Sequence, residues 1–282
     1  VVNALLVGAA CSDSTRPNFD DVPPFVFVSN ADGVPGIFRF DRGQIVRLSS
    51  AGHEDVEPHS AAGRVAFTSW RDGDPEIYIA DLQLVGQVRL TNDPSVDREP
   101  ALDPSGTTVA FVSNRSGTPR IWLMDADGAN PRSLETGSAL YVPEGSPAWS
   151  PSGDRLAFTS TRTNTSQVFV VEASGGDAGQ LSHEAGGAFM PAWNGTGDVV
   201  VYTALAPGPR LMAVPAAGGE ATTFANAGAG VGDGACAPSV CLAVSGLLEA
   251  NGDLVALRSA DKGPEHILVR SADDRQPAFL VR

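Results

Sequence analysis

Two histidines and five carboxylates lie in two short segments of the chain and have the chemistry of a metal or cation site. The segments are residues 53–59 (HEDVEPH) and 97–100 (DREP). In each, a glutamate directly precedes a proline and an aspartate stands two residues earlier, so the acids repeat at equivalent positions. Imidazole nitrogens and carboxylate oxygens are ligands of divalent metals. The predicted site consists of His53, Asp55, Glu57, His59, Asp97 and Glu99, with His53, His59, Glu57 and Glu99 as candidate metal ligands.

A second interpretation of these acids needs no ligand, because surface carboxylates are usually hydrated. No cofactor is therefore predicted, and a divalent metal stays an open alternative. Trp70 is a further candidate contact, since other copies of the same segment have Asn or Thr at this point. An exposed Trp beside Arg71 and Asp72 would anchor a partner or stack on a sugar. The alternative for Trp70 is packing over its own hairpin.

Sequence motifs of common catalytic sites are missing. The chain has no G-x-S-x-G nucleophile elbow, no H-E-x-x-H zinc motif and no glycine-rich phosphate loop ending in Lys-Ser or Lys-Thr. The motifs therefore give no support for an enzyme, and any catalytic function has to rest on the histidines and acids described above.

The elements that position these residues are copies of one repeat. Each copy has an apolar segment that we predict as a central strand, and the segments recur at a spacing of about 40 to 50 residues, which is typical of stacked supersecondary units. They are PFVFVSN (Pro24 to Asn30), VAFTSW (Val65 to Trp70), VAFVSN (Val109 to Asn114), LAFTST (Leu156 to Thr161), VVYTAL (Val200 to Leu205) and a weaker LVALRS (Leu254 to Ser259). A proline precedes each at Pro17, Pro58, Pro100, Pro147, Pro191 and Pro238.

Strands and turns alternate within each repeat. Pro-Ser-Gly and Asp-Gly segments supply the backbone angles of tight turns, and the runs between them are rich in Val, Ile, Phe and Thr. Four antiparallel strands per repeat predict an all-β fold, a six-bladed β-propeller of four-stranded antiparallel blades. We expect a tether at residues 1–15 and one propeller domain at 16–282, with blades near 16–52, 53–95, 96–141, 142–186, 187–234 and 235–282.

The repeat resembles that of the TolB-type six-bladed propellers, a family with WD-like repeats. The matching segments are PAWSPSG (147–153), AFTSTR (157–162), IWLMDADG (121–128) and Leu90-Thr91. The resemblance extends over almost the whole chain after residue 15, without a counterpart of the α/β domain that precedes the propeller in TolB. It implies the fold, a partner protein or peptide, and a location in the bacterial cell envelope; the matching residues build blades and imply no catalytic role.

The N-terminal segment indicates export. Residues 1–10 (VVNALLVGAA) are apolar and uncharged and precede Cys11 and a polar tether, which is similar to the end of a bacterial lipoprotein signal peptide. Cys11 is therefore the candidate for lipidation, and membrane attachment is expected only through this anchor. Gly8 stands where such signals usually have Leu, and a positively charged start is missing. The alternative is an edge strand or frayed tail with an incidental cysteine.

The other two cysteines form a candidate pair. Cys236 and Cys241 are separated by four residues that include a proline, and an exported protein could keep a disulfide there. Closing so short a loop would contribute about 2 kcal/mol. Two reduced thiols are the alternative if the protein stays in the cytosol.

Composition restricts the partners. The formal net charge of −14 argues against nucleic acid, whose binding proteins present basic patches. A hydrophobic content of 42% is sufficient for blade-to-blade cores. The functional hypothesis is a monomeric, non-catalytic scaffold of the periplasm or outer face of a membrane, binding a partner through one face of the ring or the channel mouth. The alternative hypothesis is a metal-dependent propeller enzyme of the lactonase or polysaccharide-lyase type, with its site at the central channel.

Overall fold

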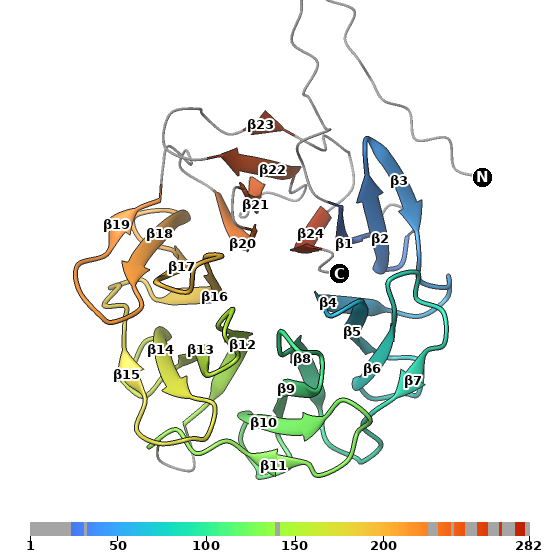
Figure 1. The fold of residues 1–282 in the computed structure, drawn as a ribbon, viewed down its shortest axis with the longest axis horizontal. Helices are drawn as coiled ribbons and strands as arrows, with labels where there is room; N and C mark the ends of the chain where they lie inside the picture. The colour runs from blue at the N-terminus through green and yellow to red at the C-terminus, as the bar shows by residue number, and fades with distance from the viewer. Residues whose placement is uncertain are drawn as a thin grey trace, which may run out of the picture.

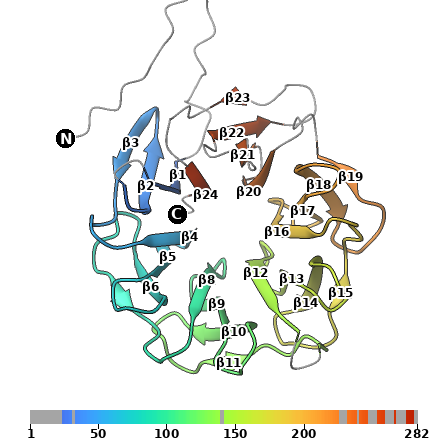
Figure 2. The same cartoon turned by 180° about the vertical axis from the view of Figure 1, so that it is seen from behind.

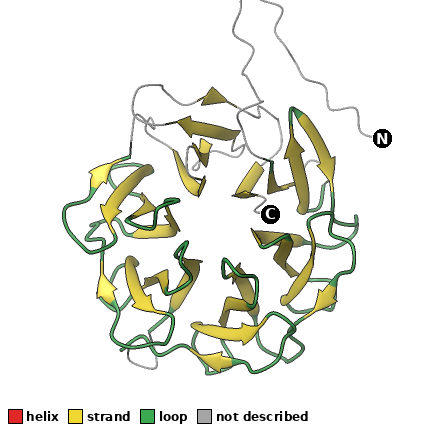
Figure 3. Ribbon diagram, in the orientation of Figure 1, coloured by secondary structure: helices red, strands yellow, loops and turns green. Residues whose placement is uncertain are grey.

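The protein is a ring of antiparallel β-sheets around a central opening (Figure 1). The computed structural model describes residues 24–30, 33–138 and 142–224, and beyond them the strands at 231–237, 240–245, 253–258, 265–266 and 274–279. None of these residues is helical (Figure 3). The described part of the chain accordingly contains no helix able to cross a lipid bilayer. The prediction of an all-β propeller with four-stranded antiparallel blades is confirmed.

Strands of the described residues pair as six four-stranded sheets. The first combines β24 (Asp274–Phe279), β1 (Phe25–Ser29), β2 (Gly36–Asp41) and β3 (Gln44–Arg47). The second has β4 (Asp55–Ala61), β5 (Arg64–Ser69), β6 (Glu76–Asp81) and β7 (Val88–Arg89). The third has β8 (Asp97–Leu102), β9 (Thr108–Ser113), β10 (Arg120–Asp125) and β11 (Arg132–Ser133).

The remaining three sheets follow the same order from the opening to the rim. The fourth has β12 (Glu144–Trp149), β13 (Arg155–Ser160), β14 (Gln167–Glu172) and β15 (Gly179–Gln180). The fifth has β16 (Ala188–Trp193), β17 (Val199–Ala204), β18 (Arg210–Pro215) and β19 (Thr222–Thr223). The last has β20 (Val231–Ala237), β21 (Val240–Ser245), β22 (Asp253–Arg258) and β23 (Glu265–His266). Seen from behind, β4, β8, β12 and β16 again border the opening (Figure 2).

The two ends of the chain are combined differently from the prediction. Strand β24 pairs with β1, with Val26 opposite Ala278, so the C-terminal strand belongs to the first sheet and not to a blade at 235–282. Strand β22, predicted as the central strand of the sixth blade, is the third, because it lies between β21 and β23. Pro17 and Pro238, the prolines predicted to precede the first and last central strands, lie outside the described residues. The physical reason is ring closure, which lets one sheet combine strands from both ends of the chain.

The inner strands β4, β8, β12 and β16 are each interrupted at the residue before their proline. The pairing register shifts between Val56 and His59 in β4 and at the equivalent point of β8, β12 and β16. The residues at the bulges have left-handed backbones, with φ of 54° at Glu57, 54° at Glu99, 51° at Ser146 and 50° at Met190. A bulge redirects the side chain it carries, and this is how the predicted glutamates leave the plane of their sheets.

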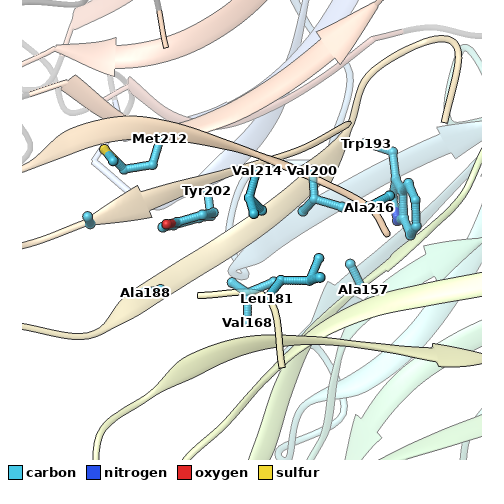
Figure 4. Packing of buried hydrophobic residues seen from close by; sticks show 11 residues of the cluster. Ala157, Val168, Leu181, Ala188, Trp193, Val200, Tyr202, Met212, Val214 and Ala216 are labelled. Carbon is cyan, nitrogen blue, oxygen red and sulfur yellow. The ribbon is translucent and has the colours of Figure 1, made fainter. Parts of the chain in front are cut away.

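The hydrophobic cores lie between neighbouring sheets. In the core of Figure 4, Ala157, Val168 and Leu181 from the fourth sheet region pack with residues of the fifth, among them Val200 and Tyr202. Equivalent buried clusters join the first to the second sheet, the second to the third and the third to the fourth. Because the second, third and fourth sheets bury both faces against their neighbours, the apolar central strands of the repeat form the cores, and polar functions are left to the inner strands and loops.

Candidate functional site

Glu57 and Glu99 link successive blades at the inner strands. The Oε2 atom of Glu57 accepts hydrogen bonds from the backbone N–H of Glu99 at 2.8 Å and from the Thr68 hydroxyl at 2.7 Å. Glu99 repeats the arrangement one blade further on, where its Oε2 accepts from the backbone N–H of Ser146 at 2.5 Å. We call Glu57, Glu99 and Ser146 the bulge belt. Each carboxylate satisfies a backbone donor that the neighbouring bulge removes from strand pairing.

The carboxylates of Glu57 and Glu99 lie close enough for their charges to interact. Burial raises the pKa of Glu57, and the nearby Glu99 carboxylate raises it further, while the hydrogen bonds from Thr68 and from the Glu99 N–H act in the opposite direction. Glu99 has its other oxygen 3.5 Å from the Nε of Arg98. The belt does not continue as carboxylates, since Ser146 and Met190 occupy the next two bulges. Among the second to fifth blades, its acidic part is thus confined to the second and third.

Asp55 and Asp97 lie away from this belt, in buried ion pairs. The Nη2 atom of Arg71 is 3.0 Å from Asp55, and that of Arg115 is 2.6 Å from Asp97. Both aspartates are fully buried. In the next blade Glu144 takes the same position, and its partner at 3.1 Å is Arg162.

The three arginines also stack on aromatic rings of their own blades. The Arg115 guanidinium carbon lies 5.3 Å from the Phe111 ring centre and 4.9 Å from that of Trp122. Arg71 and Arg162 make the same double contact. We call these pairs the arginine clasps. They hold the start of an inner strand against the hairpin of the central strand.

The two histidines have different surroundings. The Nε2 atom of His53 is 3.7 Å from Oδ2 of Asp55. His59 lies at a blade junction, where its Nδ1 accepts a hydrogen bond from the backbone N–H of Leu102 at 3.1 Å. Burial lowers the pKa of His59 to about 4, so the ring is a neutral acceptor at physiological pH.

At the two following junctions, tryptophans provide the corresponding hydrogen bond. Trp149 and Trp193 donate their indole N–H groups to the carbonyls of Ala101 and Ala148, each at 3.0 Å. Leu102 occupies the tryptophan position at the junction with the second blade and has no side-chain donor. At this junction the side chain of His59 is the acceptor and a backbone N–H is the donor. At the two tryptophan junctions the side chain is the donor and a backbone carbonyl is the acceptor.

The remaining predicted residues are placed as follows. Trp70 is partly buried just after β5, and its backbone N–H donates to the carbonyl of Glu54 at 3.0 Å. Cys236 and Cys241 are direct cross-strand neighbours in β20 and β21. Cys11 lies outside the described residues. Over the described part of the chain, no group of three or more His, Cys, Asp or Glu is placed to hold a metal ion.

Sequence reasoning missed the partners that tie the acids down. Thr68 and the backbone N–H groups of the bulges had no distinctive pattern in the sequence, although a glutamate before each proline pointed to the position. It also passed over Arg98, whose side chain is 45% exposed on the inner strand β8. At the equivalent place β16 has the partly exposed Phe189. The inner strands thus present acidic, basic and aromatic groups at different points around the opening.

The fold and these contacts define a β-propeller in which glutamates join neighbouring blades and arginines brace single blades. Residues 60–144 match the family model described as the TolB beta propeller domain. Among proteins, the chain is similar to a TolB homolog of Chlorobaculum tepidum, at 37% identity over 67 residues, and to one of Chlorobium luteolum, at 29% over 120 residues. These matches cover 23% and 43% of this chain but only 15% and 26% of those proteins.

Among solved structures, TolB from Acinetobacter baumannii has the same fold, with a TM-score of 0.74 at 16% sequence identity. The likeness covers 92% of this chain and 67% of that one. At this identity it supports the fold and not a shared activity.

Proposed function

We propose that the protein is a non-catalytic binding scaffold of the bacterial cell envelope that holds a protein or peptide partner at the channel mouth. The bulge belt carries this proposal, because Glu57 and Glu99 tie the inner strands of three blades into a preformed rim. A rigid site loses little conformational freedom on binding, which favours affinity. The similarity of residues 60–144 to TolB propellers supports the same class of function.

The architecture we propose is a closed ring of six blades in a monomer. Pairing of β24 with β1 supports it, because the last strand completes the first sheet. A ring closed in this way has no exposed inner edge, so opening it would expose two blade faces at once. The mouth would be formed by Glu57, Glu99 and Arg98, with Trp70 at its margin. His59 would support it from a blade junction, and His53, Asp55 and Asp97 from within their own blades.

Export is the second element of the proposal. Residues 1–15 would act as signal-like segment and tether, with Cys11 as the lipidated residue. The register of β20 and β21 supports a disulfide, because Cys236 and Cys241 stand directly opposite each other. Directly opposite residues in antiparallel strands have Cα atoms about 4.5 to 5.5 Å apart, within the range that a disulfide spans.

Site-specific photo-crosslinking from the mouth tests the binding function. A photoreactive amino acid replaces Arg98, and in a matched control it replaces the exposed Ser152 in the turn between β12 and β13. Expressed in a bacterial envelope, the Arg98 variant should give a discrete adduct with one protein, and the Ser152 variant should not. Equal adducts from both positions, or none from Arg98, would refute binding at this mouth. Stoichiometric metal in the purified protein would instead favour the enzyme hypothesis.

A further inference from the structure

The outer edge of the first sheet differs from every other outer edge that the structure describes. Strand β3 (Gln44–Arg47) has four residues, whereas β7, β11, β15, β19 and β23 have two each. It is the last strand of its sheet, so no strand among the described residues pairs with the side away from β2 (Figure 1). Propellers usually leave only short, protected edges, and a four-residue edge is long enough to pair with an added strand.

The hairpin that ends in β3 fixes which backbone groups face outwards. Arg42 and Gly43 have φ of 47° and 79°, the two left-handed residues of a type I′ turn. In such a turn the flanking pair, Asp41 and Gln44, is hydrogen-bonded, and hydrogen-bonded pairs alternate along an antiparallel ladder. Arg39 and Val46 are therefore the next hydrogen-bonded pair, and the backbone N–H and C=O of Ile45 point towards the open edge. The hydrogen bond from the Leu48 N–H to the Ile37 carbonyl, at 2.8 Å, agrees with this alternation.

The side chains around this edge are apolar and basic. Gln44 and Val46 are exposed, with Val46 at 49%, and they alternate with the half-buried Ile45. Arg42 at the turn is 84% exposed, and Arg39 is the cross-strand neighbour of Val46. Asp41 is the acid that both arginines approach, at 3.9 Å in each case. The first sheet thus carries a local excess of positive charge in a chain whose net charge is −14.

We propose that the β3 edge is a docking site for an extended, acidic segment of a partner protein, which adds as a fifth strand beside β3. Backbone hydrogen bonds to Ile45 supply affinity in this mode of binding, and the alternating side chains supply selectivity. The positive charge near β3 distinguishes an acidic partner strand from a second copy of this chain. A second copy of this chain, paired edge to edge, would bring Arg39 and Arg42 of both copies together, whereas an acidic strand neutralises them.

This site is separate from the channel mouth, so its test is independent of the proposed function. The probe is a short, fluorescently labelled peptide that alternates Glu with Val and Thr, and its control has Lys in place of each Glu. Fluorescence anisotropy should show saturable binding of the acidic peptide alone, weakening several-fold as salt is raised because the attraction between exposed charges is screened. Equal binding of both peptides, or binding by neither, would overturn the proposal.

Two variants examine the two components of the site. Ile45→Pro removes the outward N–H without breaking the pairing of β2 and β3, since proline is tolerated where the N–H faces away from the sheet. It should weaken binding at least about tenfold. Arg42→Glu should weaken it about threefold to tenfold by reversing the exposed charge. The matched control is Arg132→Glu, the same change on the exposed, two-residue outer strand β11, which should leave affinity unchanged.

Amide hydrogen exchange on the unaltered chain keeps the test decisive if Ile45→Pro fails to fold. The Ile45 amide should become protected when the acidic peptide is bound. Binding that persists in Arg42→Glu, or that leaves the Ile45 amide unprotected, would overturn the proposal. A concentration-dependent dimer that is lost in Ile45→Pro would overturn it as well, since a second copy would then be the occupant.

Discussion

Replacing Arg115 by Met should destabilise the protein by about 3 kcal/mol at neutral pH, because it leaves a buried carboxylate without its cation. Asp97 is fully buried and its oxygen lies 2.6 Å from Arg115, whose side chain is 19% exposed. The second acid that Arg115 approaches, Asp93, is 34% exposed and contributes little. Loss of the guanidinium from the rings of Phe111 and Trp122 adds to the effect by about 1 kcal/mol at most, since methionine keeps part of the contact.

The pH dependence of this loss is a sharper test than its size. Burial raises the pKa of Asp97, and removing Arg115 raises it further, because the positive charge is one of the groups that lower it. A carboxyl whose folded pKa exceeds its unfolded value binds its proton more readily in the folded state. The free energy of unfolding of Arg115→Met relative to the unaltered chain should therefore recover as pH falls from neutral through the raised pKa, and be lost as pH rises.

Chemical denaturation across this pH range, with thermal melting in parallel, measures both quantities. A loss of about 3 kcal/mol corresponds to about 5 °C in Tm for a domain of this size. Asp97→Asn combined with Arg115→Met should restore most of the stability, since no buried charge remains. Arg132→Met, at an exposed position, is the matched control and should be close to neutral. A loss below about 1 kcal/mol, or one that does not change with pH, would refute the account of the clasp.

Two further changes test the blade junctions. Because burial lowers the pKa of His59 to about 4, stability should be complete above pH about 6.5 and fall as pH drops towards 4, by up to about 3 kcal/mol. His59→Asn keeps an acceptor for the Leu102 N–H and should abolish this component in urea denaturation; an unchanged pH profile would contradict it. Gly145→Ala would place a Cβ 3.2 Å from Oε2 of Glu99, so it should weaken the bulge belt by about 1 kcal/mol. Gly179→Ala, with open space around its Cβ, should be neutral in the same assay, and equal effects at both positions would reject the close contact as the cause.

The repeat predicted the blades well because strand, turn and proline positions are local properties of the sequence. The repeat did not predict which strands pair where the ring closes. Residues 274–278 (DRQPA) repeat the inner-strand pattern of 97–101 (DREPA), with an acid four residues before the alanine and a proline directly before it. This similarity would have identified β24 as an inner strand. The prediction combined each inner strand with the central strand that follows it, whereas in a closed ring the last inner strand pairs with the first central strand.

The direction of the side chains at the candidate site is a second feature that the sequence did not predict. The sequence placed Glu57 and Glu99 at equivalent positions but gave no direction for their side chains. That direction comes from the bulge, a left-handed backbone before a proline, which turns each carboxylate towards the next blade. Asp55 and Asp97 stand only two residues earlier and turn into the arginine clasps instead. Spacing in a sequence therefore grouped four acids that the fold divides between two structural tasks.

Because these acids have structural contacts, binding specificity has to come from other residues. Residues that several blades share form the cores, the clasps and the inter-blade hydrogen bonds, so they hold the ring together. Side chains and backbone groups that could bind a partner lie where one blade differs from the others. Arg98 is such a difference on an inner strand, and β3 is one at the rim. A change confined to one blade can alter binding, whereas a change at a shared position would weaken a junction. The departures from the repeat are accordingly the positions at which mutations should change binding without changing the fold.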